Sequence, residues 1–216
     1  MEWALLQGLG EDEQRAVIAA GRRRRFSRRE VLFHAGDPGE ALHLIASGWV
    51  AVYVTTPVGS TASFALLGPG EAVGELALVS PGERSATAIA LEPTETLSLR
   101  RDQFEDLRRR HTGIDRLLVE LLAERVRRLD HQLVEAYFVR AETRVIRQLL
   151  ALARRMPERD GRHTVRLTQE DLAALAGTSR ATVNRALREL ERAGAIAQAR
   201  GRVDVLDLAL LADRGR

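Results

Sequence analysis

Two charged groups lie at the ends of a short, otherwise apolar stretch, GELALVSPGERSATAIA, which runs from Gly74 to Ala90. Glu75 stands at its start, and Arg84 and Ser85 follow before apolar sequence resumes. Charged side chains within apolar sequence are costly to bury unless each one has a partner. The carboxylate and the guanidinium therefore either pair with each other and close a loop, or they hold a ligand.

A second stretch, LTQEDLAALAGTSRATVNRALRELERAG, has the spacing of two short helices joined by a turn. Thr168, followed three residues later by Asp171, predicts an N-cap with a carboxylate in the first helical turn. Gly177 ends the first helix near residue 176, since glycine accepts the left-handed conformation of a helix end. Ser179 begins a second helix that runs to about Arg192. The pattern predicts a helix-turn-helix.

The outward face of the second helix has the chemistry of DNA recognition. Arg180 and Arg185 lie in its first turns, which reach base edges in the major groove, and guanidinium groups bind guanine O6 and N7. Hydroxyl groups at the turn can donate to phosphates. The alternative is a pair of packed surface helices with solvated arginines. The predicted DNA-binding residues are Thr168, Thr178, Ser179, Arg180, Ala181, Asn184, Arg185, Arg188 and Arg202.

Three kinds of element must position these groups. Residues 11–20 predict a short helix. From Glu30 to Leu99, short apolar runs separated by glycines at intervals of roughly 8–12 residues are typical of an all-β roll or barrel, with Val50–Thr56 as its clearest strand. Residues 141–155 predict an amphipathic helix, RMPERDGRH a polar loop, and AIAQARGRVDVLDL a strand, an Arg-Gly-Arg turn and a second strand, which form a wing bearing Arg202.

Between the roll and the helix-turn-helix, apolar residues recur in steps of three and four and predict a long helix with a heptad seam. Such a helix either covers its own roll or pairs with a second copy in a parallel dimer. We favour the dimer because the seam continues past the length needed to cover one small domain. The predicted dimer residues are Val119, Leu122, Val126, Leu129, Leu133 and Ala136.

The composition fits a two-domain protein whose basic C-terminal third indicates either an anionic partner or a solvated basic face. The chain has 216 residues, 45% of them hydrophobic, and no cysteine, which excludes thiolate zinc sites, cysteine-ligated iron–sulfur clusters and a cysteine nucleophile. All 33 cationic residues are arginine. Residues 1–138 hold 17 arginines against 20 acidic residues, whereas residues 139–216 hold 16 against 10. We expect a cytoplasmic protein without a secretory signal or a membrane-spanning segment.

The chain resembles the cyclic-AMP receptor protein/Fnr family of transcription factors from about Arg15 to Leu210. HAGDPGEALHLIASGWVAVYV resembles the family's glycine-punctuated roll, GELALVSPGERSATAIA its phosphate-binding cassette, and LTQEDLAALAGTSRATVNRALREL its recognition segment. The resemblance implies an α+β fold with three parts. They are a jelly-roll-like cyclic-nucleotide-binding β-roll at 1–110, a dimerisation helix at 111–138, and a winged helix-turn-helix DNA-binding domain at 139–216.

The resemblance also implies a cyclic nucleotide as effector, most simply cyclic AMP. Glu75 then accepts a hydrogen bond from the ribose 2′-hydroxyl and Arg84 neutralises the cyclic phosphate. Ser85 and backbone amides near Gly74 and Leu76 add donors. This set suits the ligand, because a phosphodiester takes one cation and several donors, and a ribose hydroxyl takes an acceptor.

Two features depart from the family, at three positions. Its cyclic-AMP receptor holds adenine with a Thr-Ser pair on the long helix, where this chain has Leu129 and Asp130, which puts the base and the response to cyclic AMP in question. Its usual glutamate after Arg180, which accepts from cytosine N4, is Ala181 here.

Two readings of the regulator stay open. One is a homodimer gated by a cyclic nucleotide. It binds a pseudo-palindromic DNA site and, by resemblance, contacts RNA polymerase. The other is a ligand-independent regulator whose roll serves only as a dimerisation scaffold. An enzyme on a cupin-like roll would need clustered metal ligands, and only His34 and His43 lie in the roll, so we expect no enzyme and no metal. The scattered histidines and missing cysteines also argue against haem and iron–sulfur clusters.

Overall fold

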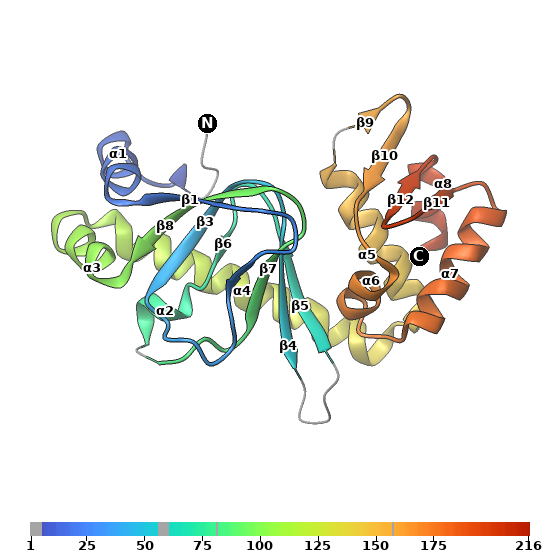
Figure 1. Ribbon diagram of the computed structural model, residues 1–216, viewed down its shortest axis with the longest axis horizontal. Helices are drawn as coiled ribbons and strands as arrows, with labels where there is room; N and C mark the ends of the chain where they lie inside the picture. Colours follow the sequence, from blue (N-terminus) through green and yellow to red (C-terminus); the bar gives the residue numbers. More distant parts are fainter. Residues whose placement is uncertain (1–5, 56–60, 81, 157) are drawn as a thin grey trace. The chain divides into compact units, whose positions relative to one another are not determined.

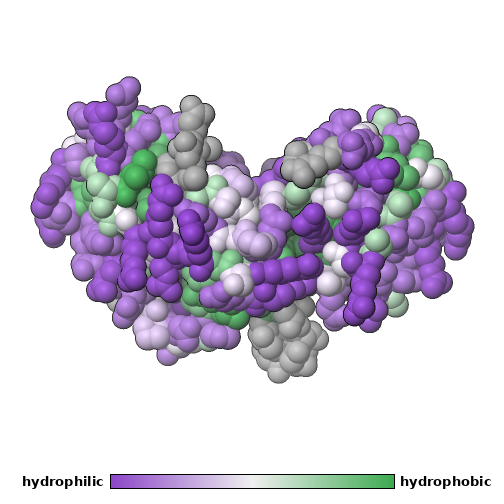
Figure 2. Space-filling view, turned by 45° about the horizontal axis from the view of Figure 1, so that its top comes forward, coloured by the Kyte–Doolittle hydropathy of each residue, from purple (hydrophilic) through white to green (hydrophobic). Residues whose placement is uncertain are grey.

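A computed structural model of the chain describes residues 6–55, 61–80, 82–156 and 158–216. These residues form two compact units. The first comprises the described residues up to Leu129 apart from 61–64, and the second comprises residues 61–64 and those from Asp130 onward. On the face shown in Figure 2, hydrophilic side chains cover most of each unit, as expected for a chain with 29% charged residues.

The first unit is built on two four-stranded sheets (Figure 1). One has the order β1-β8-β3-β6 and the other β2-β7-β4-β5. The strands span Arg22–Phe26 (β1), Val31–Phe33 (β2), Ala41–Ser47 (β3), Val50–Thr55 (β4), Thr61–Leu67 (β5), Ala72–Val73 (β6), Thr87–Ala90 (β7) and Thr94–Arg100 (β8). Leu44, Ile45 and Leu97 are among its fully buried side chains. The predicted roll is confirmed, including the strand from Val50, although Thr56 lies outside the described residues.

Four helices accompany the sheets: α1 (Glu11–Ala20), α2 (Leu76–Val79), α3 (Arg101–Arg110) and α4 (Gly113–Phe138). The first turns of α4 bury Ile114, Leu117 and Leu118 against the core of the roll. The backbone N–H of Gly113 donates to Glu13 of α1 at 2.9 Å, which fixes where α4 begins. The predicted helices at 11–20 and along the heptad seam are therefore present.

The heptad seam divides between two environments. Val119, Val126 and Leu133 are 64%, 56% and 54% exposed, so more than half of each side chain is left uncovered in the described part of the structure. Leu122 instead packs against the core of the roll. The first turns of α4 thus cover the roll, as in the first alternative, while the Val119–Leu133 face is exposed among the described residues and the dimer stays a prediction. The remaining seam residues are half-buried Leu129 and exposed Ala136.

The second unit holds the predicted helix-turn-helix and wing. Its elements are α5 (Ala141–Arg155), β9 (Glu158–Arg159), β10 (Arg162–Val165), α6 (Gln169–Leu175), α7 (Arg180–Arg192), β11 (Ile196–Ala199), β12 (Arg202–Val205) and α8 (Leu208–Arg214). Thr168 and Asp171 form the expected capping box, and Ser179 caps α7 by accepting from Thr182 N. Gly177 has a φ of 58°, the left-handed conformation that its position predicted.

The segment predicted as a polar loop contains β9 and the start of β10. These strands extend the wing hairpin into a four-stranded sheet of order β11-β12-β10-β9. Asp160 and Gly161 both have positive φ, at 52° and 70°, which is the geometry of a two-residue hairpin turn. The Asp160-Gly161 pair, a common sequence for such turns, could have identified this hairpin from the sequence. The predicted boundaries at residues 110 and 138 coincide with the ends of α3 and α4, whereas the two compact units divide within α4, between Leu129 and Asp130. The division into three domains stays a prediction.

Candidate ligand pocket and nucleic-acid interface

A cavity of about 270 Å³ opens in the roll beside α2, and five of the predicted ligand-binding residues line it. They are Gly74, Glu75, Leu76, Arg84 and Ser85. Gly74 has a φ of 84°, and a Cβ at this position would lie 2.4 Å from Nη1 of Arg84. Glycine is therefore required for the cassette backbone to turn closely around the guanidinium.

Arg84 is anchored by backbone oxygens. It is only 9% exposed. Its Nη2 donates to the carbonyl of Ala41 at 2.6 Å and its Nη1 to that of Gly74 at 3.2 Å, and the group lies 4.1 Å from the centre of the Phe33 ring. Nε is buried without a partner. Burial lowers the pKa of Arg84, and the carboxylates of Asp37, Glu75 and Glu40 oppose that shift.

Glu75 and Arg84 do not form an ion pair in the part of the chain that the structure describes. The reading in which they merely close the loop on each other is therefore wrong for this structure. Glu75 stands in the cavity wall with its carboxylate close enough to raise the pKa of Arg84. The cavity wall thus carries a cation and a carboxylate that are not paired with each other.

His43 stands behind this site as a neutral group. Its Nδ1 lies 3.1 Å from the hydroxyl of Thr96, and its ring packs edge-on against Phe26. Burial, with the charges of Arg84 and Arg24, lowers the pKa of His43 from 6.5 to about 4. Because the imidazole is uncharged at neutral pH, it adds no positive charge beside Arg84.

The wall of the cavity that faces α4 differs from the prediction. Arg125 of α4 lines the cavity, whereas neither Leu129 nor Asp130 is among its lining residues. Arg125 lies one helical turn before Leu129 on the same face, and this i, i+4 relation was the signal that would have identified it. Within one chain, then, the predicted base-contacting pair lies away from the cavity.

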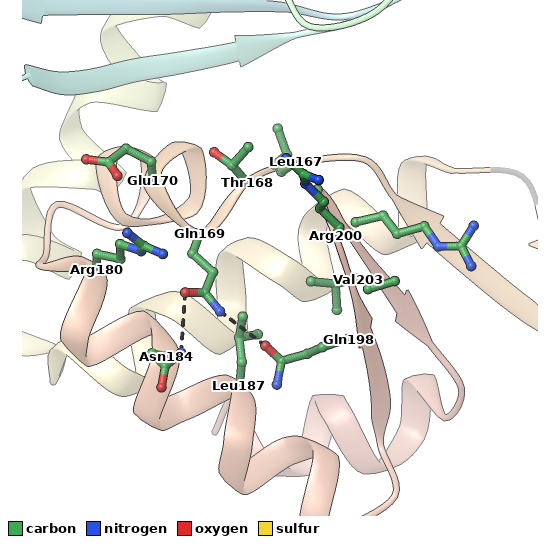
Figure 3. Close-up of a pocket in the computed structure, with 13 residues that line it drawn as sticks. Leu167, Thr168, Gln169, Glu170, Arg180, Asn184, Leu187, Gln198, Arg200 and Val203 are labelled. Atoms are coloured by element: carbon green, nitrogen blue, oxygen red, sulfur yellow. Dashed lines mark hydrogen bonds between the residues drawn. The ribbon is translucent and has the colours of Figure 1, made fainter.

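The second unit has a concave surface between α6, the start of α7 and the wing (Figure 3), and the hollow has a volume of about 540 Å³. Of the predicted DNA-binding residues, Thr168, Arg180, Asn184 and Arg202 line it. The others lie outside it at the turn or on α7: Thr178 is half-buried, and Ser179, Ala181, Arg185 and Arg188 are exposed.

The hydroxyl groups that begin α6 and α7 are already engaged in helix capping. Thr168 Oγ1 donates to Oδ2 of Asp171 at 2.7 Å, and Ser179 Oγ lies 3.1 Å from the hydroxyl of Thr182. A hydroxyl with its proton in an internal hydrogen bond must rotate before it can donate to a phosphate. Phosphate contact by Thr168 requires this rotation, and phosphate contact by either residue stays a prediction.

Two arginines have partners that the sequence did not indicate. Arg185 forms an ion pair with Glu142 at the start of α5, and the pKa of Glu142 is lowered by a hydrogen bond from its own backbone N–H and by this pair. Arg144 of α5 donates to the carbonyls of Val139, Ala176 and Gly177, each at 2.9 Å. Arg144 therefore ties the turn of the helix-turn-helix to α5.

The described residues form neither a metal site nor a membrane span. No group of three or more histidine and acidic side chains within the described residues is arranged to hold a metal ion. Among the same residues, no helix is long and apolar enough to cross a membrane.

Comparisons with known proteins match both units. Residues 23–111 match the model of the cyclic nucleotide-binding domain, and residues 143–214 match that of the Crp-like helix-turn-helix domain. A relative described as "Cyclic AMP receptor protein" from Thermus thermophilus is 41% identical over 209 residues, covering 96% of this chain and 94% of the relative. A "CRP-like cAMP-activated global transcriptional regulator" from Mycobacterium tuberculosis is 34% identical and covers 88% of this chain and 87% of its own.

Solved structures show the same fold. The catabolite activator protein of Thermus thermophilus is 39% identical, covers 98% of both chains and superposes with a TM-score of 0.57. FixK2 from Bradyrhizobium japonicum superposes with a TM-score of 0.79 over 91% of this chain and 98% of its own. At 20% identity, FixK2 supports the fold alone.

Proposed function

We propose, from the premise that this chain belongs to the cyclic-AMP receptor protein/Fnr family of transcriptional regulators, that cyclic AMP binds in its roll and controls DNA recognition by its winged helix. Membership makes the chain a DNA-binding regulator with a cyclic-nucleotide-binding domain rather than an enzyme. Family members act as dimers on DNA. The proposal adds the identity of the effector, the residues that hold it and the form of the DNA site.

One observation carries the effector proposal: Arg84 and Glu75 line one cavity without pairing with each other. Arg84 uses one N–H of Nη1 and one of Nη2 for the carbonyls of Gly74 and Ala41, and the second N–H of each can donate to a cyclic phosphate. Glu75 supplies an acceptor for the ribose hydroxyl. The name of the Thermus relative and the description of the mycobacterial one favour cyclic AMP over other cyclic nucleotides.

The base of the nucleotide is recognised differently from the family pattern in this proposal. Arg125 provides a guanidinium at the α4 side of the cavity. Leu129 and Asp130 would approach a base only from the α4 helix of a second copy, because within one chain they do not line the cavity. The exposed face from Val119 to Leu133 supports a dimer through α4, since coiled-coil seams bury such residues.

DNA recognition follows from the winged helix. Arg180 and Arg185 each bind a guanine, and Arg188 and Arg202 contact phosphates. A two-fold dimer presents two equivalent helices, so the site is a pseudo-palindrome with half-sites about 34–36 Å apart. The C·G pair that the family's glutamate reads is weakly specified, because Ala181 has no acceptor. We further propose contact with RNA polymerase and a cytoplasmic location, which the family resemblance supports.

Calorimetric titration tests the effector proposal. Wild-type protein is titrated with cyclic AMP and with cyclic GMP, and the affinity for a selected DNA duplex is then measured with and without each nucleotide. We expect saturable binding of cyclic AMP and tighter DNA binding in its presence. Unchanged DNA affinity together with no heat of nucleotide binding would favour the alternative, in which the roll is a ligand-independent scaffold.

A further inference from the structure

Three side-chain amides in the concave surface of the second unit form a line that ends on a carboxylate. Asn184 Nδ2 donates to Oε1 of Gln169 at 3.4 Å, and Gln169 Nε2 donates to Oε1 of Gln198 at 3.3 Å. Gln198 Nε2 then donates to Glu191 Oε2 at 2.9 Å. We call these four residues the amide relay. It joins α6, α7 and the wing strand β11, and Figure 3 shows its two amide–amide contacts.

The carboxylate fixes the direction of every hydrogen bond in the relay. Ionised Glu191 can only accept, and its Oε1 also accepts from the backbone N–H of Gln198 at 2.8 Å. Gln198 must therefore turn its NH₂ group to Glu191 and its oxygen to Gln169. Gln169 must in turn present its NH₂ group to Gln198 and its oxygen to Asn184. The end of the relay is an Asn184 amide whose nitrogen faces Gln169.

This orientation decides which hydrogen-bonding groups Asn184 offers to DNA. Its Oδ1 points away from Gln169 in Figure 3. Asn184 is half-buried and lines the open concave surface, so this oxygen and the second N–H of its amide can reach a ligand there. An amide that accepts with its oxygen and donates with its nitrogen matches N6 and N7 of adenine. Ala181, one turn earlier, has only a methyl group and cannot compete with Asn184 for hydrogen bonds to the adenine edge.

We propose that Asn184 reads one adenine in each DNA half-site and that Glu191, acting through Gln198 and Gln169, is the positioning residue that sets this preference. The inference rests on the proposed function, because it requires α7 to lie in the major groove. It adds a base contact whose donor and acceptor order is set by a carboxylate several side chains away.

The substitution Glu191→Gln separates positioning from packing. Glutamine has nearly the same shape, and its amide oxygen can still accept from the backbone N–H of Gln198. Its NH₂ group, however, can donate to Gln198 Oε1 and allow the whole relay to reverse. A reversed Asn184 turns its NH₂ group toward the groove, where thymine O4 and guanine O6 are the acceptors. Glu189→Gln, an exposed position on the same helix, controls for the loss of one negative charge.

A selection from randomised duplexes, run on wild type, Asn184→Ala, Glu191→Gln and Glu189→Gln, tests the proposal. We expect wild type and Glu189→Gln to prefer adenine at one position per half-site by roughly tenfold or more. Asn184→Ala should lose that preference, and Glu191→Gln should shift it toward thymine or guanine. Both variants should keep the guanine positions of wild type, which shows that they fold and dock.

Two results would overturn the inference. One is an adenine preference in Glu191→Gln equal to that of wild type. The other is a wild-type profile that Asn184→Ala does not change. Failure of the proposed function looks different, because wild type would then show no sequence preference at any position.

Discussion

Replacing Arg84 by leucine should affect two separable quantities. In the free protein, the guanidinium holds two backbone carbonyls, of Ala41 and Gly74, from the buried side of the cavity. Hydrogen bonds from a charged donor contribute roughly 1.5–3 kcal/mol each, but burial of the cation, seen in its lowered pKa, offsets part of that gain. Leucine can still pack on Phe33. We expect the free energy of unfolding to fall by about 1–3 kcal/mol.

The loss of nucleotide affinity should be larger than the loss of stability. Truncating one member of a desolvated charge pair costs on the order of 2–5 kcal/mol, which corresponds to a weakening of cyclic AMP binding by roughly 30-fold to several thousandfold. Arg84→Lys keeps the charge but lacks the planar fork, so its affinity should fall between those of wild type and Arg84→Leu.

Urea unfolding followed by far-ultraviolet circular dichroism, which reports both units, gives the stability, and calorimetric titration gives the affinity. Arg144→Leu is the matched control, because Arg144 also holds backbone carbonyls but lies in the second unit. It should lower stability and leave nucleotide affinity unchanged. If Arg84→Leu lost stability but bound cyclic AMP within twofold of wild type, Arg84 would be a structural residue and the phosphate assignment would be refuted.

Three further predictions concern other parts of the chain. In the folded state the pKa of His43 is about 4, against 6.5 in the unfolded chain, so the contribution of the neutral imidazole to the free energy of unfolding is complete above pH 6.5 and is lost as the pH falls to 4 and below. Urea unfolding should therefore show that the free energy of unfolding falls by about 3 kcal/mol more between pH 7 and pH 4 in wild type than in His43→Gln. Glu142→Gln releases Arg185, and fluorescence anisotropy at low salt should show DNA binding roughly two- to fivefold tighter than for wild type, whereas weaker binding would mean that the pair orients Arg185 productively. Val119→Glu with Val126→Glu places like charges on the exposed face of α4 without disturbing the core of the roll, and light scattering should report a monomer; a double variant that stayed dimeric would exclude this seam as the interface.

The helix-turn-helix could be predicted nearly residue by residue because local interactions define it. The Thr168–Asp171 capping box, the left-handed Gly177 and the Ser179 cap depend on contacts within a few residues, and sequence patterns record such contacts directly. The roll was predictable as a class of fold from its glycines and strand lengths. Its division into two sheets was not, because strand pairing joins distant segments, as in β1 with β8.

The polar interactions of the candidate site could likewise be predicted only where they depend on neighbouring residues. The type and spacing of Glu75 and Arg84 indicated a site, and the structure brings both to one cavity. That Arg84 would donate to Ala41, 43 residues away, depends on how β3 passes the cassette. The ion pair of Glu142 with Arg185 likewise spans 43 residues and has no local signature. Long-range partners of arginine are the features that the sequence patterns did not contain.

The hydrogen bonds from Arg144 to the carbonyls of Ala176 and Gly177 have a consequence for the thermodynamics of DNA binding. These carbonyls lie at the turn that sets α7 relative to α6, and the arginine fixes them without any DNA present. A recognition element ordered in advance avoids the entropy loss and the extra heat-capacity change of coupled folding. The heat-capacity change on binding should therefore scale with the surface buried at the interface alone. In Arg144→Leu it should become more negative, because the turn would then order only upon the DNA.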